Sequence, residues 1–275
     1  MFTLYHHGSS VCAAKVRFAM AQKGLEWEGV YIDILKGDQF DPEYVKLNPK
    51  AVVPTLVHDG TVIVDSTVIC EYLDKILPDL NPMHPSDPWE YAQARYWTKA
   101  VDEDLHPACA ALTFVCSHRH TVLKNLGEEG MKNFLASTPP ISVTSDWKAK
   151  KDIFTRYGFE APEAVDKIKL YDSYLWKMEK ALETGNDWLV GNEFSIADIA
   201  MAPYVNRCAM LSLSGMWTNG RMPNLEKWFS RVSALPNFKT CLLDWVPEDL
   251  TSDLRENGAK SWPEVAKILD IVSRN

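Results

Sequence analysis

The apolar and polar positions of residues 1–78 alternate between the period of strands and the period of helices. The run FTLY is a short apolar strand, and LEWEGVYIDI (25–34) has the composition of a second strand. Between them, the segment from Cys12 to Gly24 repeats apolar residues at helical spacing, with Lys15 and Gln22 expected on the outer face. These elements predict a βαβ unit.

The next segment, VVPTLVHDGTVIV (52–64), contains two β-rich runs on either side of Asp59-Gly60, a dipeptide suited to a tight hairpin turn. A helix should follow, because apolar residues recur at i, i+3, i+4, i+7 and i+8 from Ile69 to Leu77. Residues 1–78 are therefore predicted to form an α/β domain with the element order βαβ-ββα around a mixed sheet.

Beyond this domain the pattern becomes helical. The segment from Pro78 to Pro88 has four prolines and few apolar residues, which predicts a linker over residues 79–88. Apolar stripes at helical spacing over residues 89–275 predict an all-α domain, in which Ser195 and Asp198 form a capping-box pattern at a helix start. Residues 137–163 have weak periodicity, so we expect an insert that runs as a long loop.

Composition excludes several classes of function. Lys and Arg total 29 against 37 Asp and Glu, giving a net charge of −8 and a pI of about 5.4, which argues against a nucleic-acid partner. No apolar run approaches the roughly 20 residues of a membrane span, and no signal-peptide pattern follows Met1, so we expect a cytoplasmic protein. Six cysteines lack metal-ligand spacing and predict reduced, mostly buried thiols without a metal centre.

Three polar side chains mark the start of the first predicted helix. Ser9, Ser10 and Cys12 fall within its first turn, where free N–H groups and a partial positive charge stabilise anions. A cysteine facing this end would have a lowered pKa, and a serine would donate to a sulfur anion. The alternative is structural: a serine caps the helix and Cys12 packs in the core.

Two further segments offer polar backbone groups. Pro54 interrupts a β-rich run, so it should lie at an edge or bend, and a cis Val53-Pro54 bond would turn the backbone groups of Val53 outward. Asp65 and Ser66 open the next predicted helix. They are either an N-cap or a second helix N-terminus that offers N–H and hydroxyl groups to a carboxylate.

Taken in order, the Ser/Cys turn, the proline-bent strand and the Asp-Ser helix start before a helical domain resemble the glutathione transferase superfamily. The resemblance implies a thioredoxin-like N-terminal domain, glutathione as cosubstrate and a homodimer. It also implies that Ser9 and Val53, next to cis Pro54, contact glutathione. Asp65 and Ser66 would hold its γ-glutamyl group, and Lys50 would face its glycine carboxylate.

Different segments resemble different branches of this superfamily. SSVCAAKVR (9–17) is similar to zeta-class enzymes and reductive dehalogenases, whereas DSTVICEYLDKILPD (65–79) and RYWTKAVDE (95–103) are similar to bacterial β-aryl etherases. The resemblance implies displacement by a glutathione thiolate, stabilised by Ser10, on an aromatic substrate, most closely the cleavage of lignin-type β-aryl ethers. Dehalogenation with Cys12 as a second catalytic thiol, zeta-like isomerisation and non-catalytic binding are the alternatives.

The hydrophobic aromatic substrate should bind over the helical domain in a mostly apolar pocket. Its candidate lining residues are Trp97, Val101, Leu105, Tyr204 and Trp217, although residues at such spacing more often form core. His106 and Arg207 are possible polar contributors, but a helical arginine is usually solvated. His6 and His7 follow the first strand near the Ser/Cys turn, where a histidine without a chemical role is the better prediction.

Overall fold

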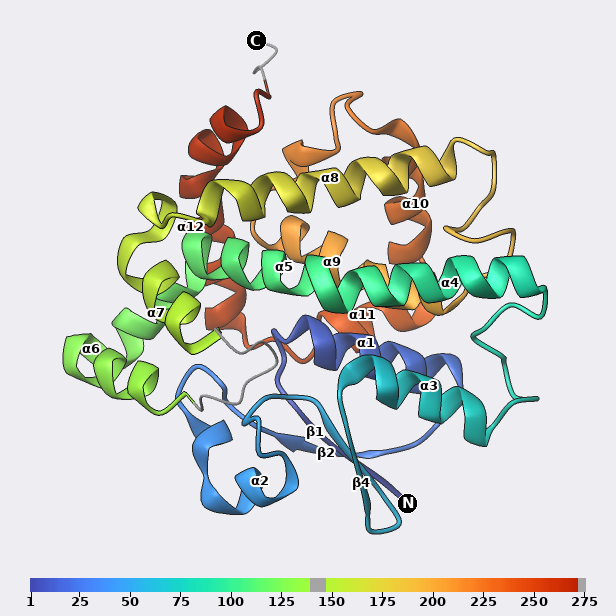
Figure 1. Cartoon of the computed structure of the whole chain (residues 1–275), viewed down its shortest axis with the longest axis horizontal. Coiled ribbons are helices and arrows are strands. Elements are labelled where there is room, and N and C mark those ends of the chain that lie inside the picture. Colours follow the sequence, from blue (N-terminus) through green and yellow to red (C-terminus); the bar gives the residue numbers. More distant parts are fainter. Residues whose placement is uncertain (139–146, 272–275) are drawn as a thin grey trace.

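The computed structural model describes residues 1–138 and 147–271, which form a strand-containing part below a helical part (Figure 1). The four strands and three helices of the first part are β1 (Phe2–His6), α1 (Val11–Gln22), β2 (Glu28–Tyr31), α2 (Pro42–Leu47), β3 (Thr55–His58), β4 (Thr61–Val64) and α3 (Ser66–Ile76). This arrangement confirms the predicted α/β thioredoxin-like fold and its βαβ-ββα order.

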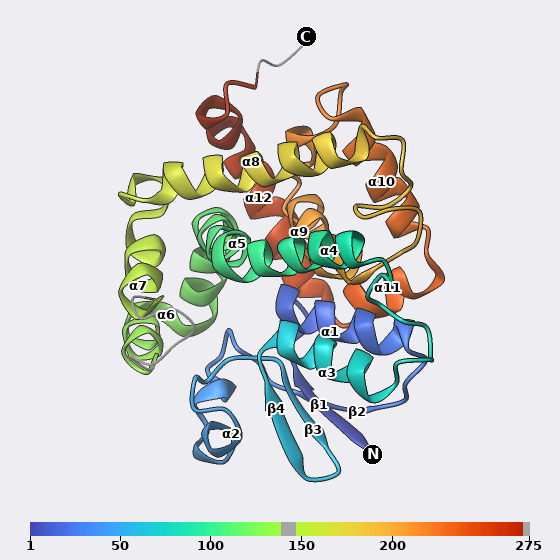
Figure 2. The same cartoon turned by 45° about the vertical axis from the view of Figure 1, so that its right-hand side comes forward.

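The sheet has the strand order β2-β1-β3-β4, with β1 and β2 parallel and the other neighbours antiparallel. Asp59 and Gly60 have φ angles of 49° and 84°, the left-handed conformations that a two-residue hairpin turn requires. Helices α1 and α3 lie between the sheet and the helical part in both views (Figures 1 and 2). The start of α1 therefore faces the boundary between the two parts.

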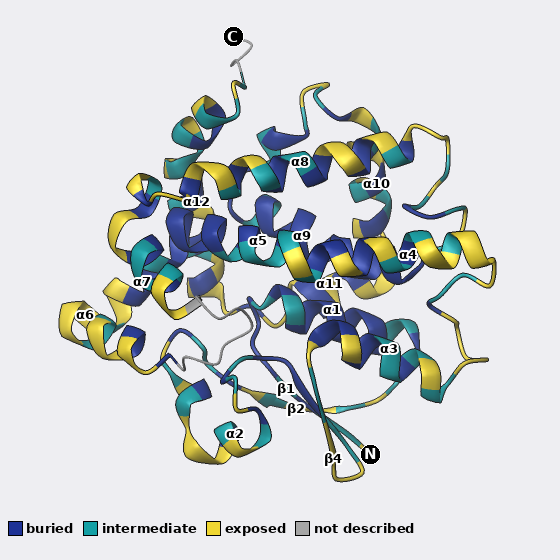
Figure 3. Ribbon diagram, in the orientation of Figure 1, coloured by how far each residue is buried: buried dark blue, intermediate teal, exposed yellow. Residues whose placement is uncertain are grey.

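Helix α1 is buried on almost every face, because it is packed between the sheet and the helical part (Figure 3). Lys15 was expected on the outer face, but its side chain is 1% exposed and its Nζ donates to Thr67 Oγ1 at 2.7 Å. The expectation fails because a one-sided helix was assumed, whereas α1 is covered from both sides. Gln22 is half buried.

The helical part begins with a nearly continuous helical run and then folds back across it. Its helices are α4 (Pro88–Ala100), α5 (His106–Thr113), α6 (Arg119–Ala136), α7 (Trp147–Tyr157), α8 (Ala164–Leu182), α9 (Ile196–Met210), α10 (Pro223–Ser233), α11 (Pro236–Leu242) and α12 (Glu248–Ile268). Two π-helical turns, η2 (Val101–Leu105) and η3 (Phe114–His118), join α4 to α5 and α5 to α6. The capping box at Ser195 is present, and Asp198 accepts from the Ser195 N–H at 3.0 Å.

The segment between α3 and α4 is anchored rather than loose. Met83 is buried, its N–H donates to Asp74 Oδ1 at 2.9 Å, and its carbonyl accepts from Ile196 N–H at 2.8 Å. The connection thus contacts both parts of the molecule.

The insert differs from the long loop expected over residues 137–163. Its described part forms the helix α7 and a short 3-10 turn, η4 (Gly158–Glu160), while residues 139–146 lie outside the described residues. The apolar period of α7 is hidden in the sequence because Lys151 and Thr155 are buried beside Phe154. No helix in residues 1–138 and 147–271 is both long and apolar enough to cross a membrane.

Candidate functional site

A cavity of about 380 Å³ opens between the strand-containing part and the helical part. This volume lies in the range of roughly 300–1,000 Å³ that is usual for small-molecule sites. Its wall includes all eight residues predicted to bind glutathione or act on it: Ser9, Ser10, Cys12, Lys50, Val53, Pro54, Asp65 and Ser66. Within the described ranges, no group of three metal-binding side chains comes together.

Ser9 and Ser10 occupy the turn that leads into α1. Ser10 is the N-cap: its Oγ accepts from the Ala13 N–H at 3.2 Å, while the residue also lines the cavity. Ser9 is buried, and its Oγ lies 3.2 Å from His7 Nδ1. Capping and a place on the cavity wall are therefore compatible roles for Ser10, because the cap uses its oxygen and leaves its hydroxyl hydrogen to another acceptor.

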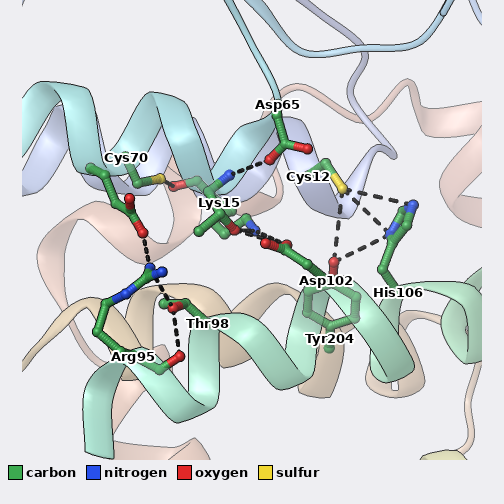
Figure 4. Close-up of polar contacts among 11 residues, drawn as sticks. Cys12, Lys15, Asp65, Cys70, Arg95, Thr98, Asp102, His106 and Tyr204 are labelled. Atoms are coloured by element: carbon green, nitrogen blue, oxygen red, sulfur yellow. Dashed lines mark hydrogen bonds and ion pairs between the residues drawn. The ribbon is translucent and has the colours of Figure 1, made fainter. Parts of the chain in front are cut away.

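Cys12 faces two polar side chains of the helical part. Its Sγ lies 3.4 Å from His106 Nδ1 and 3.8 Å from the Tyr204 hydroxyl, which is itself 3.3 Å from His106 Nδ1 (Figure 4). Burial raises the pKa of the Cys12 thiol, but His106, Lys15 and Ser66 lower it more, to about 7. The site thus holds a cysteine whose thiolate is substantially populated near neutral pH, unlike that of an ordinary cysteine.

The imidazole of His106 forms an ion pair with the Cys12 thiolate, and its pKa is shifted accordingly. Burial lowers the pKa of His106, but the neighbouring Cys12 raises it more, so the net pKa lies above the usual value. Together the two shifts favour a thiolate beside an imidazolium. His106 reaches this position at the first turn of α5, directly after the π-helical η2, a type of irregularity frequent at functional sites.

A hydrogen-bonded chain behind Cys12 joins three elements. Lys15 on α1 donates to Thr67 on α3, and Thr67 Oγ1 donates to Asp102 Oδ1 on η2 at 2.8 Å. Lys15 Nζ also lies 3.4 Å from the Asp102 carboxylate. Because these hydrogen bonds link both parts of the molecule, they fix the position of one cavity wall relative to the other.

The loop before β3 presents its backbone to the cavity. The Val53-Pro54 bond is cis, as predicted, and both residues line the wall. The carbonyl of Val52 accepts from the Tyr44 hydroxyl at 2.6 Å and from Asn48 Nδ2 at 2.9 Å, which fixes the bend. The half-buried Lys50 lies on the same loop, at the wall.

Asp65 combines an N-cap with an unusual backbone conformation. Its carboxylate accepts from the Thr67 N–H at 3.2 Å, and its φ angle is 75°. A left-handed non-glycine residue costs of order 1–3 kcal/mol, and such residues cluster at functional sites. Asp65 is exposed at the rim, whereas Ser66 is buried.

The predicted substrate-pocket residues lie in a different place. They are at most 4% exposed and belong to the hydrophobic core, and none is among the described residues that line the cavity: Trp97, Val101, Leu105, Tyr204 and Trp217. These side chains pack against neighbouring helices instead of the cavity, because the helical part has several layers that bury them on all sides. Tyr204 reaches the site only through its hydroxyl.

The aromatic wall is formed by residues outside the predicted pocket set. Phe40, Phe114, Phe134 and Phe154 line the cavity with Lys151. Four of these five lie in the helical part: Phe114 in the π-helical η3, Phe134 in α6, and Lys151 and Phe154 in α7. The irregular geometry at η3 and the buried polar residues of α7 obscure the apolar period there. Of the five, only Lys151 and Phe154 lie in residues 137–163, whose basic and aromatic composition was the available signal for them.

The remaining polar candidates are buried. His6 and His7 are at most 1% exposed, and neither is among the described lining residues, which agrees with a structural role. Burial lowers the pKa of His6 to about 3 and that of His7 to about 4. Arg207 is 3% exposed rather than solvated, lines the cavity, and donates through Nη2 to the Ser9 carbonyl.

Comparisons with known proteins agree with this geometry. The N-terminal and C-terminal domain models of glutathione S-transferase match residues 9–76 and 140–236. Protein LigF from Sphingobium sp. strain SYK-6 is 29% identical over 93% of this chain and 98% of LigF. The crystal structure of beta-etherase LigF matches with a TM-score of 0.77 and 28% identity over 87% of this chain and 98% of that chain.

Two further relatives are similar over most of their length. Glutathione S-transferase 1 from Dianthus caryophyllus is 45% identical over 74% of this chain and 75% of that protein. Maleylacetoacetate isomerase from Mus musculus is 31% identical over 74% of this chain and 76% of that protein. With a thioredoxin-like domain, a helical domain and matches to both domain models, the chain belongs to the glutathione S-transferase superfamily.

Proposed function

We propose that this protein uses the thiolate of glutathione to displace a phenolate from an aromatic substrate, cleaving lignin-type β-aryl ethers. The observation that carries the proposal is the cavity, which joins the polar turn at Ser10 to an aromatic wall. The similarity to beta-etherase LigF over nearly all of that chain supports this reaction above the alternatives.

In the proposed complex, glutathione lies along the loop at Val53 with its γ-glutamyl group at Asp65 and Ser66. Its glycine carboxylate faces Lys50, and its sulfur faces Ser9 and Ser10. The shared cavity wall supports this arrangement, because every one of these residues lines it.

The chemistry needs an ionised sulfur. A thiol has an unperturbed pKa near 8.5, and lowering it by about two units corresponds to roughly 2.7 kcal/mol, within reach of a serine hydrogen bond and a helix N-terminus. The sulfur attacks the carbon that bears the ether oxygen, the carbon–oxygen bond breaks, and the phenolate leaves with the electron pair. The products are a glutathione thioether and a phenol.

A second candidate function follows from Cys12. Its lowered pKa and its contact with His106 suit a reductive dehalogenase, in which Cys12 attacks the sulfur of a glutathione–aryl thioether. The aryl carbon then takes the electron pair and a proton, and a second glutathione resolves the enzyme–glutathione disulfide. Isomerisation without net use of glutathione is a third candidate, supported by the similarity to maleylacetoacetate isomerase.

The three reactions differ in their use of thiol. We would incubate the protein with glutathione and either a guaiacylglycerol-type β-aryl ether ketone or a chlorinated hydroquinone, and measure phenol and free thiol. Ether cleavage consumes one thiol per product, dehalogenation consumes two, and isomerisation consumes none. Release of guaiacol with one thiol consumed supports the proposal, and intact ether contradicts it.

A non-catalytic role is the remaining alternative. It predicts that glutathione is bound without turnover of any of these substrates, or that the protein is not retained on immobilised glutathione. The cytoplasmic location stays a prediction.

A further inference from the structure

One charged side chain of the aromatic wall has no role in the function proposed above. Lys151, on α7, is 5% exposed and lines the cavity, and its Nζ donates to Thr138 Oγ1 at 3.0 Å. Among residues 1–138 and 147–271, no carboxylate lies within ion-pairing distance of this ammonium group. An ammonium has three donors, so two remain for another acceptor.

The surroundings of Lys151 are aromatic. Its Nζ lies 3.7 Å from the ring centroid of Phe134 and 5.7 Å from that of Phe40, and the two rings are 5.9 Å apart. The ring faces stabilise a cation, but less than water or a carboxylate would. Burial accordingly lowers the pKa of Lys151 to about 7. An apolar side chain would fill this position at a smaller desolvation cost.

The acidic groups on the cavity wall are engaged elsewhere. Asp65 accepts from the Thr67 N–H at the rim. Asp102 accepts from Thr67 Oγ1 and lies beside Lys15, and Glu103 pairs with Lys99. A second buried cation of the wall, Arg207, has Nε and Nη1 without a hydrogen-bond partner in the described structure. The cavity wall therefore carries two buried cations, Lys151 and Arg207, among apolar side chains, which suits an aromatic anion.

We propose that Lys151 binds a carboxylate carried by the aromatic second substrate. The proposal rests on the proposed function for the presence of such a substrate. Glutathione would occupy the half of the cavity at Ser10, Val53 and Asp65, which leaves the phenylalanine-lined half to the other reactant. The same oxyanion chemistry is present in the glycine carboxylate of glutathione, so the test must separate the two sources.

Equilibrium binding tests the proposal without any turnover. We would titrate the glutathione-saturated protein with 4-hydroxybenzoate and with its methyl ester, and measure the affinity of each by isothermal titration calorimetry. The wild-type protein should bind the acid more tightly than the ester by roughly 10-fold or more, since a hydrogen bond to a charged group is worth about 1.5–3 kcal/mol. Equal affinity for acid and ester in the wild-type protein would show the proposal to be wrong, whatever the variants do.

Variants assign the preference to one side chain. Lys151→Met keeps the length of the side chain and should lose this preference, while changing affinity for the ester by less than about 3-fold. Lys151→Arg should retain it. Lys148→Met is the matched control, because Lys148 lies on the same helix, is exposed, and donates to the Ala136 carbonyl. A Lys151→Met protein that still prefers the acid as strongly as wild type contradicts the proposal.

A third measurement separates the two carboxylate sources. The Kd for glutathione and for its glycine monoethyl ester would be measured in wild type and Lys151→Met. The proposal expects both values to be unchanged by the substitution. If Lys151→Met weakens glutathione but not the ester, Lys151 serves the glycine carboxylate and the proposal fails. Because no arm requires ether cleavage, an inactive protein would contradict the proposed function alone.

Discussion

Cys12 differs from the other five cysteines in what lies beside its sulfur. All six are free thiols, but burial raises the pKa of Cys70 and of Cys116 to about 12; Lys15 lowers the pKa of Cys70, but burial outweighs it. At Cys12 the partner is His106, which is 94 residues further along the chain. Cys12 is half buried while the other five are buried, and only Cys12 has the imidazole of His106 beside its sulfur.

Alkylation should reveal this difference. Below pH 7 the Cys12 thiolate is protonated, and above it the thiolate dominates, so the rate of iodoacetamide labelling at Cys12 should reach half its maximum near pH 7. His106→Gln removes the imidazolium while burial remains, so the midpoint should move to higher pH. The check is peptide mass spectrometry over a pH series, and an identical midpoint in both proteins would exclude the ion pair.

Ser10 should affect both catalysis and folding. Ser10→Ala removes the proposed donor to the glutathione sulfur and should slow turnover by roughly 10²-fold or less, since backbone N–H groups remain. It also removes the N-cap, at a cost of about 1 kcal/mol. Ser10→Gly separates the effects, because glycine is tolerated as a cap. If Ser10→Gly retains the wild-type kcat/KM, the hydroxyl has no chemical role.

At the scale of elements, the start of α9 is held by one carboxylate with several donors. Asp198 is fully buried and accepts from the N–H groups of Leu189 and Ser195 at 3.0 Å and from Trp228 Nε1 at 2.8 Å. The capping box predicted from sequence is therefore part of a larger junction. Helix α9 carries Arg207 to the cavity wall and the Tyr204 hydroxyl to Cys12, so this junction also positions part of the site.

Asp198→Ala should lower the free energy of unfolding by about 2–4 kcal/mol, because several buried donors lose their acceptor together. Urea denaturation measures this change. The exposed Asp166 in the first turn of α8 is the control, and Asp166→Ala should change stability by less than about 0.5 kcal/mol. Equal effects at the two positions would mean that the junction contributes little.

At the scale of the whole molecule, the cavity exists only because two parts of the chain meet. Its strand-side wall carries Phe40 and the residues proposed for glutathione, and its helix-side wall carries His106, the other three phenylalanines and Lys151. Neighbouring helices α3 and α4, which are linked by the Arg95–Glu71 ion pair, expose the apolar side chains of Val68 and Tyr96. The family resemblance implies a homodimer, and we predict that these two helices form its interface.

Light scattering after size-exclusion chromatography tests this assembly. We expect a mass of twice the 31.2 kDa chain, and Val68→Arg should reduce it to that of a single chain because it charges the proposed interface. Trp176 on α8 is also exposed, at 45%, and Trp176→Arg should leave the mass unchanged. A wild-type protein with the mass of one chain would contradict the prediction.

The parts of the fold that were predicted correctly are those with a local cause. The hairpin at Asp59-Gly60 and the capping box at Ser195 depend only on residues adjacent in the chain, so the local sequence predicted both. Lys15 and α7 were predicted incorrectly because burial there is imposed by distant surfaces. The cavity lining was missed for the same reason, since an apolar stripe on a helix does not indicate whether it faces a neighbour or a hollow.

The local sequence was enough to predict the strands and helices of residues 1–78 and the polar turn at Ser10. It was also enough to predict membership of the glutathione transferase superfamily, which these motifs imply. The causes of these elements are periodicity, capping and turn chemistry, which act over a few residues. The ion pair of Cys12 with His106 and the burial of Lys151 among aromatic rings arise only when segments far apart in the chain pack together. Charge, desolvation and access at a site are set by that packing, and no short stretch of sequence contains it.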